Sequence, residues 1–180
     1  DLIGTLPAAS EIRSFVADVV ASLPATEEIT ALHAEIFHTP DDRLVLCEIA
    51  CRPGGCGHVP VYEHALGVNL YAASLRGQAG CADPPPDLTA TPPCMVGFAW
   101  FPPREGVLKR MPSHCPLPGV FRYQTKAEIG DTYAGAGSVA DYIACLFVQG
   151  SAEEDLQPKI AAVDAWWREQ CEWERAEAVI

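Results

Sequence analysis

The sequence predicts an α+β fold in which helices accompany short antiparallel strands. Apolar residues recur at helical spacing near the start and near the end of the chain. Between them lie several short runs with the composition and alternation of strands, separated by Pro and Gly clusters. A Pro-rich segment, residues 81–94, is interpreted as a linker between a first lobe (1–80) and a β-rich second lobe (95–180) that ends in a helix.

In the first lobe, the pattern predicts a helix that Ser10 caps and Pro24 ends. A turn with the sequence PDDR joins two strand-like runs, and a Gly-rich loop follows them. The expected elements are a helix over 10–23, strands over 29–38 and 44–51, and a helical segment over 60–79 that breaks at Gly67 to Asn69.

In the second lobe, the runs MVGFAWF, GVLKRM, GVFRYQT and YIACLFVQ are expected to be strands. Residues 151–178 are expected to be helical, with Ser151 and Glu154 as a capping box and a break near Pro158. The same helix is expected to carry an aromatic packing stripe and a solvated acidic face. The stripe consists of Trp166, Trp167 and Trp173, and the acidic face of Glu169, Glu172, Glu174 and Glu177.

The composition is that of a folded domain, because 49% of the 180 residues are hydrophobic and 20% are charged. A formal net charge of -12 argues against a nucleic-acid partner. No apolar run is long enough for a transmembrane helix, and the first residues lack the features of a signal peptide. The eight cysteines are widely spread, so we expect mostly buried, reduced thiols in a cytoplasmic protein.

Two glutamates stand out because they lie within otherwise apolar, strand-like runs. If residues 40–43 form a four-residue hairpin loop, Thr39 faces Leu44 and Glu35 faces Glu48. Like charges directly opposite one another destabilise a sheet unless a cation lies between them. Magnesium is typically held by one or two carboxylates, with substrate phosphates and water at its other positions. The pair therefore indicates a magnesium site; the alternative is two solvent-facing glutamates on an ordinary sheet.

The segment after the second strand has the chemistry of an anion-binding loop. Arg52 carries a planar guanidinium suited to bidentate contact with a carboxylate or a phosphate. Gly54 and Gly55 allow the backbone to approach a ligand closely and to point N–H groups at an anion. An ordinary tight turn remains the alternative.

Several other interpretations of this region stay open. Cys51, Cys56 and His58 can belong to a zinc site, although a second pair of ligands is missing. Cys56 and His58 can instead line the substrate pocket or form a nucleophile and base. His33 shares a face with Glu35, where it can lie behind a metal or be a surface histidine.

HAEIFHTPDDRLVLCEIACRPGG, residues 33–55, followed by HVPVYEHALGVNLY, resembles the metal-binding C-terminal part of ATP-grasp enzymes. The resemblance is strongest to the carboxylate–amine ligase branch, which includes L-amino-acid ligases. It rests on the H-x-E strand, the second acid within E-I-A-x-R-P-G-G, and the later G-V-N-L. GFAWFPPREGVLKRM, PGVFRYQTKAEIGD and DYIACLFVQGSAEED resemble the small β-rich C-terminal subdomain of the same family.

The resemblance implies the C-terminal half of an ATP-grasp fold, an antiparallel sheet with helices, plus a small β-rich C-terminal subdomain. It implies ATP and Mg²⁺ as cofactors, and small-molecule carboxylate and amine substrates joined through an acyl-phosphate. The implied metal ligands are Glu35 and Glu48, the implied catalytic residue is Arg52, and the implied substrate-binding residues are Arg52, Gly54, Gly55 and Cys56.

Two departures from the family pattern matter. Ala50 stands where many ATP-grasp enzymes have Asn. The three lysines (Lys109, Lys126 and Lys159) all lie in the second lobe, whereas the family grips its nucleotide with an upstream, lysine-bearing lobe. We therefore expect a C-terminal part of a longer enzyme, inactive as an isolated chain. N-terminal domains or a partner subunit would complete its ATP site, and assembly as a homo-oligomer stays open. The alternative is a non-catalytic binding module derived from half of an ATP-grasp enzyme.

Overall fold

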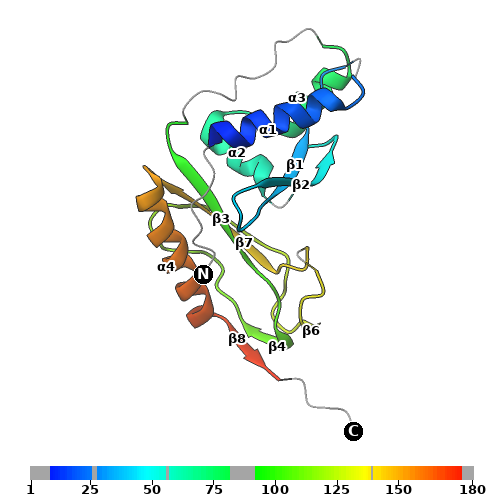
Figure 1. Ribbon diagram of the computed structural model, residues 1–180. Helices are drawn as coiled ribbons and strands as arrows, with labels where there is room; N and C mark the ends of the chain where they lie inside the picture. Colours follow the sequence, from blue (N-terminus) through cyan, green and yellow to red (C-terminus); the bar gives the residue numbers. More distant parts are fainter. Residues whose placement is uncertain (1–8, 26–27, 56, 82–91, 139, 176–180) are drawn as a thin grey trace. The chain divides into compact units, whose positions relative to one another are not determined.

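The computed structural model contains helices and antiparallel strands, so the predicted α+β class is confirmed. Its two compact units are Asp1–Val59 with Val68–Leu88, and Pro60–Gly67 with Thr89–Ile180 (Figure 1). Pro60–Gly67 therefore belongs with the second unit, although it precedes the Pro-rich segment. The structure describes residues 9–25, 28–55, 57–81, 92–138 and 140–175.

The described residues of the first unit form an antiparallel hairpin and two helices. Strand β1 (His33–His38) pairs with β2 (Leu44–Ala50), which confirms the two predicted strands, the first of them shortened at its start. Helix α1 (Ala9–Ser22) confirms the predicted first helix, and α3 (Leu70–Gln78) forms the second half of the predicted broken segment. Ser10 was expected to cap α1, but it lies within the first turn, because the helix already includes Ala9.

The break in the helical segment falls where the sequence predicts it. Helix α2 (His58–Leu66) ends before Gly67, which adopts a positive φ of 70°. Asn69 then caps α3, because its side-chain oxygen accepts a hydrogen bond of 3.0 Å from the N–H of Ala72.

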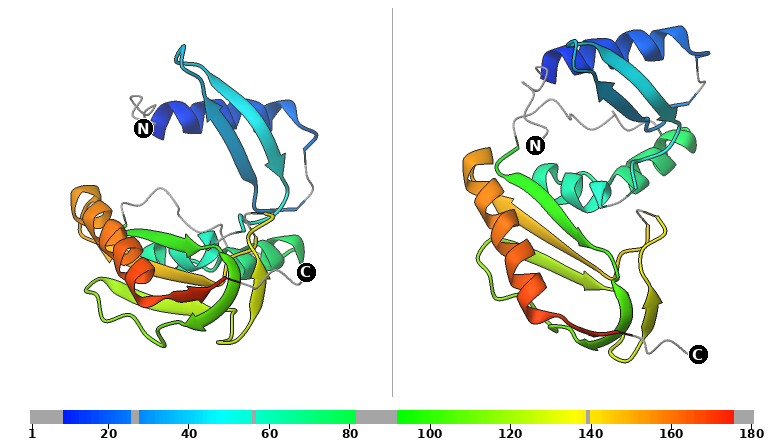
Figure 2. Two further views of the ribbon diagram at one scale, coloured as in Figure 1. Left: turned by 90° about the horizontal axis from the view of Figure 1, so that it is seen from below. Right: turned by 60° about the horizontal axis from the view of Figure 1, so that its bottom comes forward.

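In its described residues, the second unit contains two three-stranded antiparallel sheets, most of α2 and the long helix α4 (Glu153–Gln170). Figure 2 shows α4 lying along the sheet β3-β7-β5. Gly97 of β3 permits this approach, because a Cβ atom there would lie 2.8 Å from Cδ1 of Ile160. The first sheet consists of β3 (Met95–Phe101), β7 (Ala144–Gly150) and β5 (Val120–Thr125), and the second of β6 (Thr132–Ala134), β4 (Glu105–Arg110) and β8 (Glu172–Glu174).

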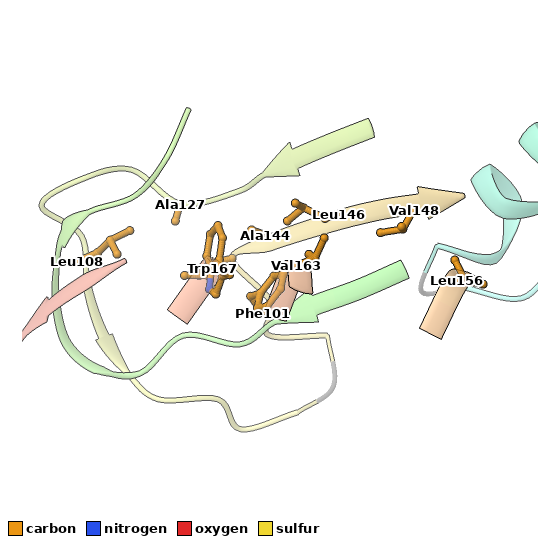
Figure 3. Close-up of a cluster of buried hydrophobic side chains, with 10 residues drawn as sticks. Phe101, Leu108, Ala127, Ala144, Leu146, Val148, Leu156, Val163 and Trp167 are labelled. Atoms are coloured by element: carbon orange, nitrogen blue, oxygen red, sulfur yellow. The ribbon is translucent and has the colours of Figure 1, made fainter. Parts of the chain in front are cut away.

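The hydrophobic core described by the structure lies in the second unit (Figure 3). Strand β7 is central in its sheet, and its residues from Ala144 to Val148 are all buried. The ring of Phe101 stacks on Trp167 of α4, with ring centroids 4.6 Å apart. Burial on both faces explains why β7 reads as a continuous apolar run instead of an alternating one.

The chain end differs from the prediction, because α4 stops at Gln170 and a short strand follows. Trp173 was expected in the helix, but it lies in β8, pairs with Leu108 and packs edge-on against Tyr133. Glu172 and Glu174 are likewise not on a helix face. Glu172 pairs with Arg110 at 2.8 Å, and Glu174 with Lys109 at 2.7 Å.

The start of α4 also differs from the prediction. Ser151 and Glu154 do not form a capping box, and Ala152 at the N-cap position makes no side-chain cap. Instead, Asp155 accepts hydrogen bonds from the N–H and the hydroxyl of Ser151, at 2.8 and 3.1 Å. Hydrogen bonds from Lys159 and Ser151 lower the pKa of Asp155 to about 2. Pro158 lacks an N–H and so removes one hydrogen bond from the helix, but α4 continues through it to Gln170.

The cysteines are less buried than expected. Of the seven described, all free, Cys145 is buried, three are partly buried and three are exposed. Cys47 is among the exposed cysteines, and its β2 neighbours Val45, Leu46 and Glu48 are exposed as well. None of the described helices has both the length and the apolar character needed to cross a membrane.

Candidate functional site

The hairpin of the first unit brings the two predicted metal-binding acids together. Glu35 of β1 and Glu48 of β2 are direct cross-strand partners, so their side chains stand on the same face of the hairpin. Their side chains are 54% and 53% exposed. The predicted pairing of these two residues is therefore confirmed, and both carboxylates are accessible to a ligand.

A β-bulge produces this pairing by a route that the sequence does not reveal. At the tip, His38 pairs with Leu44, so the connection is one residue longer than the predicted four-residue loop. The register then shifts beside Cys47, which has no partner on β1, and Glu35 pairs with Glu48. Asp42 in the turn has a positive φ of 60°, a conformation that Asp tolerates better than most residues.

Arg52 lies just beyond the end of β2, and its side chain is 54% exposed. Its Nη2 atom is 3.9 Å from Oε1 of Glu48, and its Nη1 donates a hydrogen bond of 3.2 Å to the carbonyl of Pro53. The contact with Glu48 is long, so the guanidinium keeps donors for an external anion. A carboxylate pair and a guanidinium thus share one end of the hairpin.

The two glycines after Arg52 have different surroundings. Gly54 is buried, and a Cβ atom there would lie 2.9 Å from Nδ1 of His33 and 3.2 Å from Cγ of His58. Around Gly55, in contrast, a Cβ atom would meet nothing within 4 Å. Gly54 is therefore required by internal packing, and Gly55 is the glycine with open space beside it.

Two histidines pack around Gly54. His58 begins α2, and its backbone N–H and its ring Nδ1 both lie within hydrogen-bonding distance of the carbonyl of Gly55, at 3.1 and 2.5 Å. The rings of His33 and His58 are tilted, with centroids 5.5 Å apart. Nε2 of His33 lies 3.4 Å from Oε1 of Glu35. The sequence places His33 beside Glu35 but gives no signal for its contact with the distant Gly54.

The oxygen donors of Glu35 and Glu48 are of the kind that magnesium prefers. Among the described residues, no group of three or more His, Cys, Asp or Glu side chains is arranged to hold a metal ion. Two accessible carboxylates match the usual protein share of a magnesium site, where phosphates and water supply the rest. A structural zinc site needs four protein ligands. Cys56, which was expected to bind substrate, lies outside the described residues.

No family model matches the sequence, and no curated protein matches it. Solved structures do match the fold. The L-amino acid ligase from Bacillus licheniformis matches with a TM-score of 0.65 and 14% identity, over 97% of this chain and 43% of the ligase. The biotin carboxylase domain of Hydrogenobacter thermophilus 2-oxoglutarate carboxylase, solved with MgADP, ADP and bicarbonate, matches with a TM-score of 0.62 and 17% identity.

That second match covers 96% of this chain and 38% of the carboxylase domain. The phosphoribosylglycinamide synthetase from Anaerococcus prevotii matches with a TM-score of 0.55 and 11% identity, over 81% of this chain and 37% of the synthetase. All three are ATP-grasp enzymes, so the resemblance seen in the sequence is confirmed at the level of the fold. The chain spans less than half the length of each structure.

Proposed function

We propose that this chain supplies the metal-binding and anion-binding part of an ATP-dependent carboxylate–amine ligase. In the proposed reaction, a substrate carboxylate attacks the γ-phosphorus of ATP and releases ADP. The amine substrate then attacks the acyl-phosphate carbon, so that an amide forms and inorganic phosphate leaves. The fold shared with ATP-grasp ligases and the chemistry of the hairpin support this proposal.

The observation that carries the proposal is the cross-strand pair of Glu35 and Glu48 with Arg52 beside it. Opposed carboxylates cost sheet stability. Here both carboxylates are about half exposed, and they lie next to the guanidinium of Arg52, which keeps N–H donors for a ligand. Such a group of residues suits a phosphoryl transfer, where charge on several oxygens must be neutralised at once.

Each residue of the proposed site has a separate task. Glu35 and Glu48 would hold Mg²⁺, which supplies neutralisation of the nucleotide phosphates when it is bound. Arg52 would hold the acyl-phosphate or the substrate carboxylate. Gly55, with open space beside it, would leave room for the substrate, whereas Gly54 serves the packing of the loop.

The remaining parts of the proposed enzyme lie outside these residues. N-terminal domains or a partner subunit would supply the nucleotide-gripping lysines and complete the ATP site. The substrates would be a small carboxylic acid, such as an amino acid, and an amine. The seven free thiols of the described cysteines support a reducing, cytoplasmic location.

The experiment that tests this proposal is a calorimetric titration of Mg²⁺ into the full-length protein, with and without ADP. Glu35→Gln and Glu48→Gln keep the side-chain volume and remove the charge. We expect each to weaken Mg²⁺ binding in the presence of ADP by at least about tenfold and to abolish ADP formation. Glu169→Gln, on the exposed face of α4, is the matched control. Unchanged turnover in Glu48→Gln, with retained folding, would exclude the metal assignment.

A non-catalytic binding module is the second candidate function. Ala50 favours it, because this residue pairs with His33 in the hairpin and offers no side-chain ligand where many ATP-grasp enzymes have Asn. A full-length protein that binds Mg²⁺ and ADP without ADP formation from ATP would support the module. Formation of ADP that depends on an acid and an amine would exclude it.

A further inference from the structure

We infer that His33 is a positioning residue that holds the carboxylate of Glu35 in place and connects it to the loop that carries Arg52. This inference rests on the proposed function, because it assigns a role within the proposed magnesium site. It accounts for the contacts among a partly buried histidine, His33, the tightly packed Gly54 and a second histidine, His58, next to the exposed carboxylate of Glu35.

The contact with Glu35 is the first step. Nε2 of His33 lies 3.4 Å from Oε1 of Glu35, on the same face of β1. The two side chains differ in exposure: that of His33 is 20% exposed and that of Glu35 is 54% exposed. The ring is therefore the more fixed partner, and the carboxylate is the one that can move.

The second step is what fixes the ring. Gly54 lies so close to Nδ1 of His33 that even one additional carbon would be 2.9 Å away. The ring of His58 packs on another side, with its centroid 5.5 Å from that of His33. His58 is in turn tied to the carbonyl of Gly55 through its ring and its backbone. The loop after β2 thus packs against the ring of His33 and restricts its position.

The third step is the consequence for a metal. Carboxylates that bind metals are usually oriented by a hydrogen-bonding neighbour, and loss of such a neighbour typically costs about 10- to 100-fold in metal affinity. His33 is placed to do this for Glu35. The same ring packs against the loop that follows Arg52. Movement of the loop would therefore displace the carboxylate of Glu35, and movement of the carboxylate would displace the loop.

His38 offers a matched control on the same strand. Its side chain is 23% exposed, close to the 20% of His33, and its Nε2 lies 2.7 Å from Oδ1 of Asp42. It lies at the opposite end of β1, next to the turn. A general cost of removing a histidine from the hairpin would therefore appear in both His33→Ala and His38→Ala.

The first test measures Mg²⁺ binding by calorimetry to the full-length protein in the presence of ADP. We expect His33→Ala to weaken binding by about 10- to 100-fold. His33→Gln should restore most of the affinity, because its amide nitrogen can occupy the place of Nε2. His38→Ala should leave the affinity unchanged. A His33→Ala variant that binds Mg²⁺ as the wild type does, while Glu35→Gln loses binding, would overturn the inference and leave the proposed function standing.

If Glu35→Gln and Glu48→Gln both bind Mg²⁺ normally, the proposed function fails, and the inference fails with it. A second test needs no metal. Gly54→Ala should lower the thermal unfolding midpoint by several degrees, and Gly55→Ala should lower it much less, because no atom lies near a Cβ there. His33→Ala combined with Gly54→Ala should recover part of the loss, because it removes the ring that the new methyl group meets. Strictly additive losses would overturn the packing of His33 against Gly54.

Discussion

Arg52 is the residue whose chemistry bears most directly on the proposed reaction. Its guanidinium is half exposed, and its contact with Glu48 is long, at 3.9 Å. Because it would stabilise charge on the transferring group, Arg52→Ala is expected to slow ADP formation by about 10²- to 10³-fold. Hydroxylamine can trap the acyl-phosphate as a hydroxamate, and the rate of hydroxamate formation should fall by a similar factor in Arg52→Ala.

Two other variants separate charge from geometry in that experiment. Arg52→Lys keeps the charge but loses the planar fork, so an intermediate rate is expected. Arg43 in the hairpin turn is 69% exposed and paired with Asp41, and Arg43→Ala should keep the wild-type rate. A near-normal rate in Arg52→Ala would exclude its proposed role.

The buried thiol of Cys145 predicts how stability depends on alkaline pH. Burial raises the pKa of Cys145 to about 11. A group whose pKa is higher in the folded state stabilises that state below the pKa of the unfolded chain. The stabilisation is lost as the pH rises toward the folded value. We therefore expect the free energy of unfolding to fall between about pH 9 and pH 11.

Urea denaturation at several pH values measures this effect. Cys145→Ala removes the titrating thiol, so the decline should be shallower in that variant than in the wild type. Cys171, whose pKa burial also raises to about 11, accounts for part of the decline that remains. Equal declines in the wild type and Cys145→Ala would contradict the prediction.

At the residue scale, residue type was a poor guide to cysteine burial, whereas the positions of the two acids within apolar runs correctly predicted their cross-strand pairing. Cysteine is often buried, yet Cys47, Cys51 and Cys81 are exposed. Glu35 and Glu48 could be recognised because a charged residue inside an apolar run breaks the expected pattern. The contact of Gly54 with His33 could not be predicted, since it depends on how a loop folds back on a strand 21 residues earlier.

Among the secondary-structure elements, the hairpin was predicted correctly for an incomplete reason. The predicted four-residue loop is wrong, because His38 pairs with Leu44. The extra residue in the turn is compensated by the bulge beside Cys47, and the two acids end up opposite each other. Apolar alternation fixes which face a residue occupies, but it does not reveal where a strand accommodates an additional residue.

The end of the chain shows the opposite case, in which the pattern was present but was interpreted as helix. Glu172, Trp173 and Glu174 alternate polar and apolar, as in a strand with one buried face. The two glutamates pair with basic residues of β4, while the indole packs inward. A three-residue alternation is too short to be distinguished in the sequence from the long helical pattern that precedes it. Strand β8 is recognised only in the structure, through its pairing with β4.

Helix α3 carries a glycine, Gly77, whose replacement by alanine should destabilise the protein instead of stabilising it. Alanine normally stabilises a helix interior relative to glycine by about 1 kcal/mol. At Gly77, however, a Cβ atom would lie 2.5 Å from the carbonyl oxygen of Ile29. Overpacking of this kind typically costs about 1–3 kcal/mol, so Gly77→Ala should destabilise the protein.

Chemical denaturation of Gly77→Ala, with Ala72→Gly on the exposed face of the same helix as the control, measures this difference. Ala72 lies in the first turn of α3, where its N–H bonds to the cap residue Asn69, so Ala72→Gly should lose at most about 1 kcal/mol through helix propensity. A Gly77→Ala variant that is more stable than the wild type would show that the segment around Ile29 does not pack tightly on α3.

Across the whole molecule, apolar burial is unequally divided between the two units. The six largest fully buried side chains, which are Phe147, Leu108, Leu146, Val148, Val163 and Cys145, all belong to the second unit. Eight of the ten large apolar residues that are exposed among the described residues belong to the first: Leu23, Ile29, Leu32, Phe37, Val45, Leu46, Tyr71 and Leu75. The proposed site therefore lies in the unit with the smaller core.

This division predicts a gradient of amide hydrogen exchange along the chain. The central strand β7 is hydrogen-bonded on both sides and fully buried from Ala144 to Val148, so its amides should exchange only through global opening. Strands β1 and β2 pair only with each other in the described part of the chain, and a two-stranded sheet has little stability of its own. Their amides should exchange orders of magnitude faster than those of β7. Hydrogen exchange followed by mass spectrometry on this 180-residue chain measures the rates in the hairpin and in β7. Hairpin amides that exchange as slowly as those of β7 would contradict the view that apolar burial determines local stability in this protein.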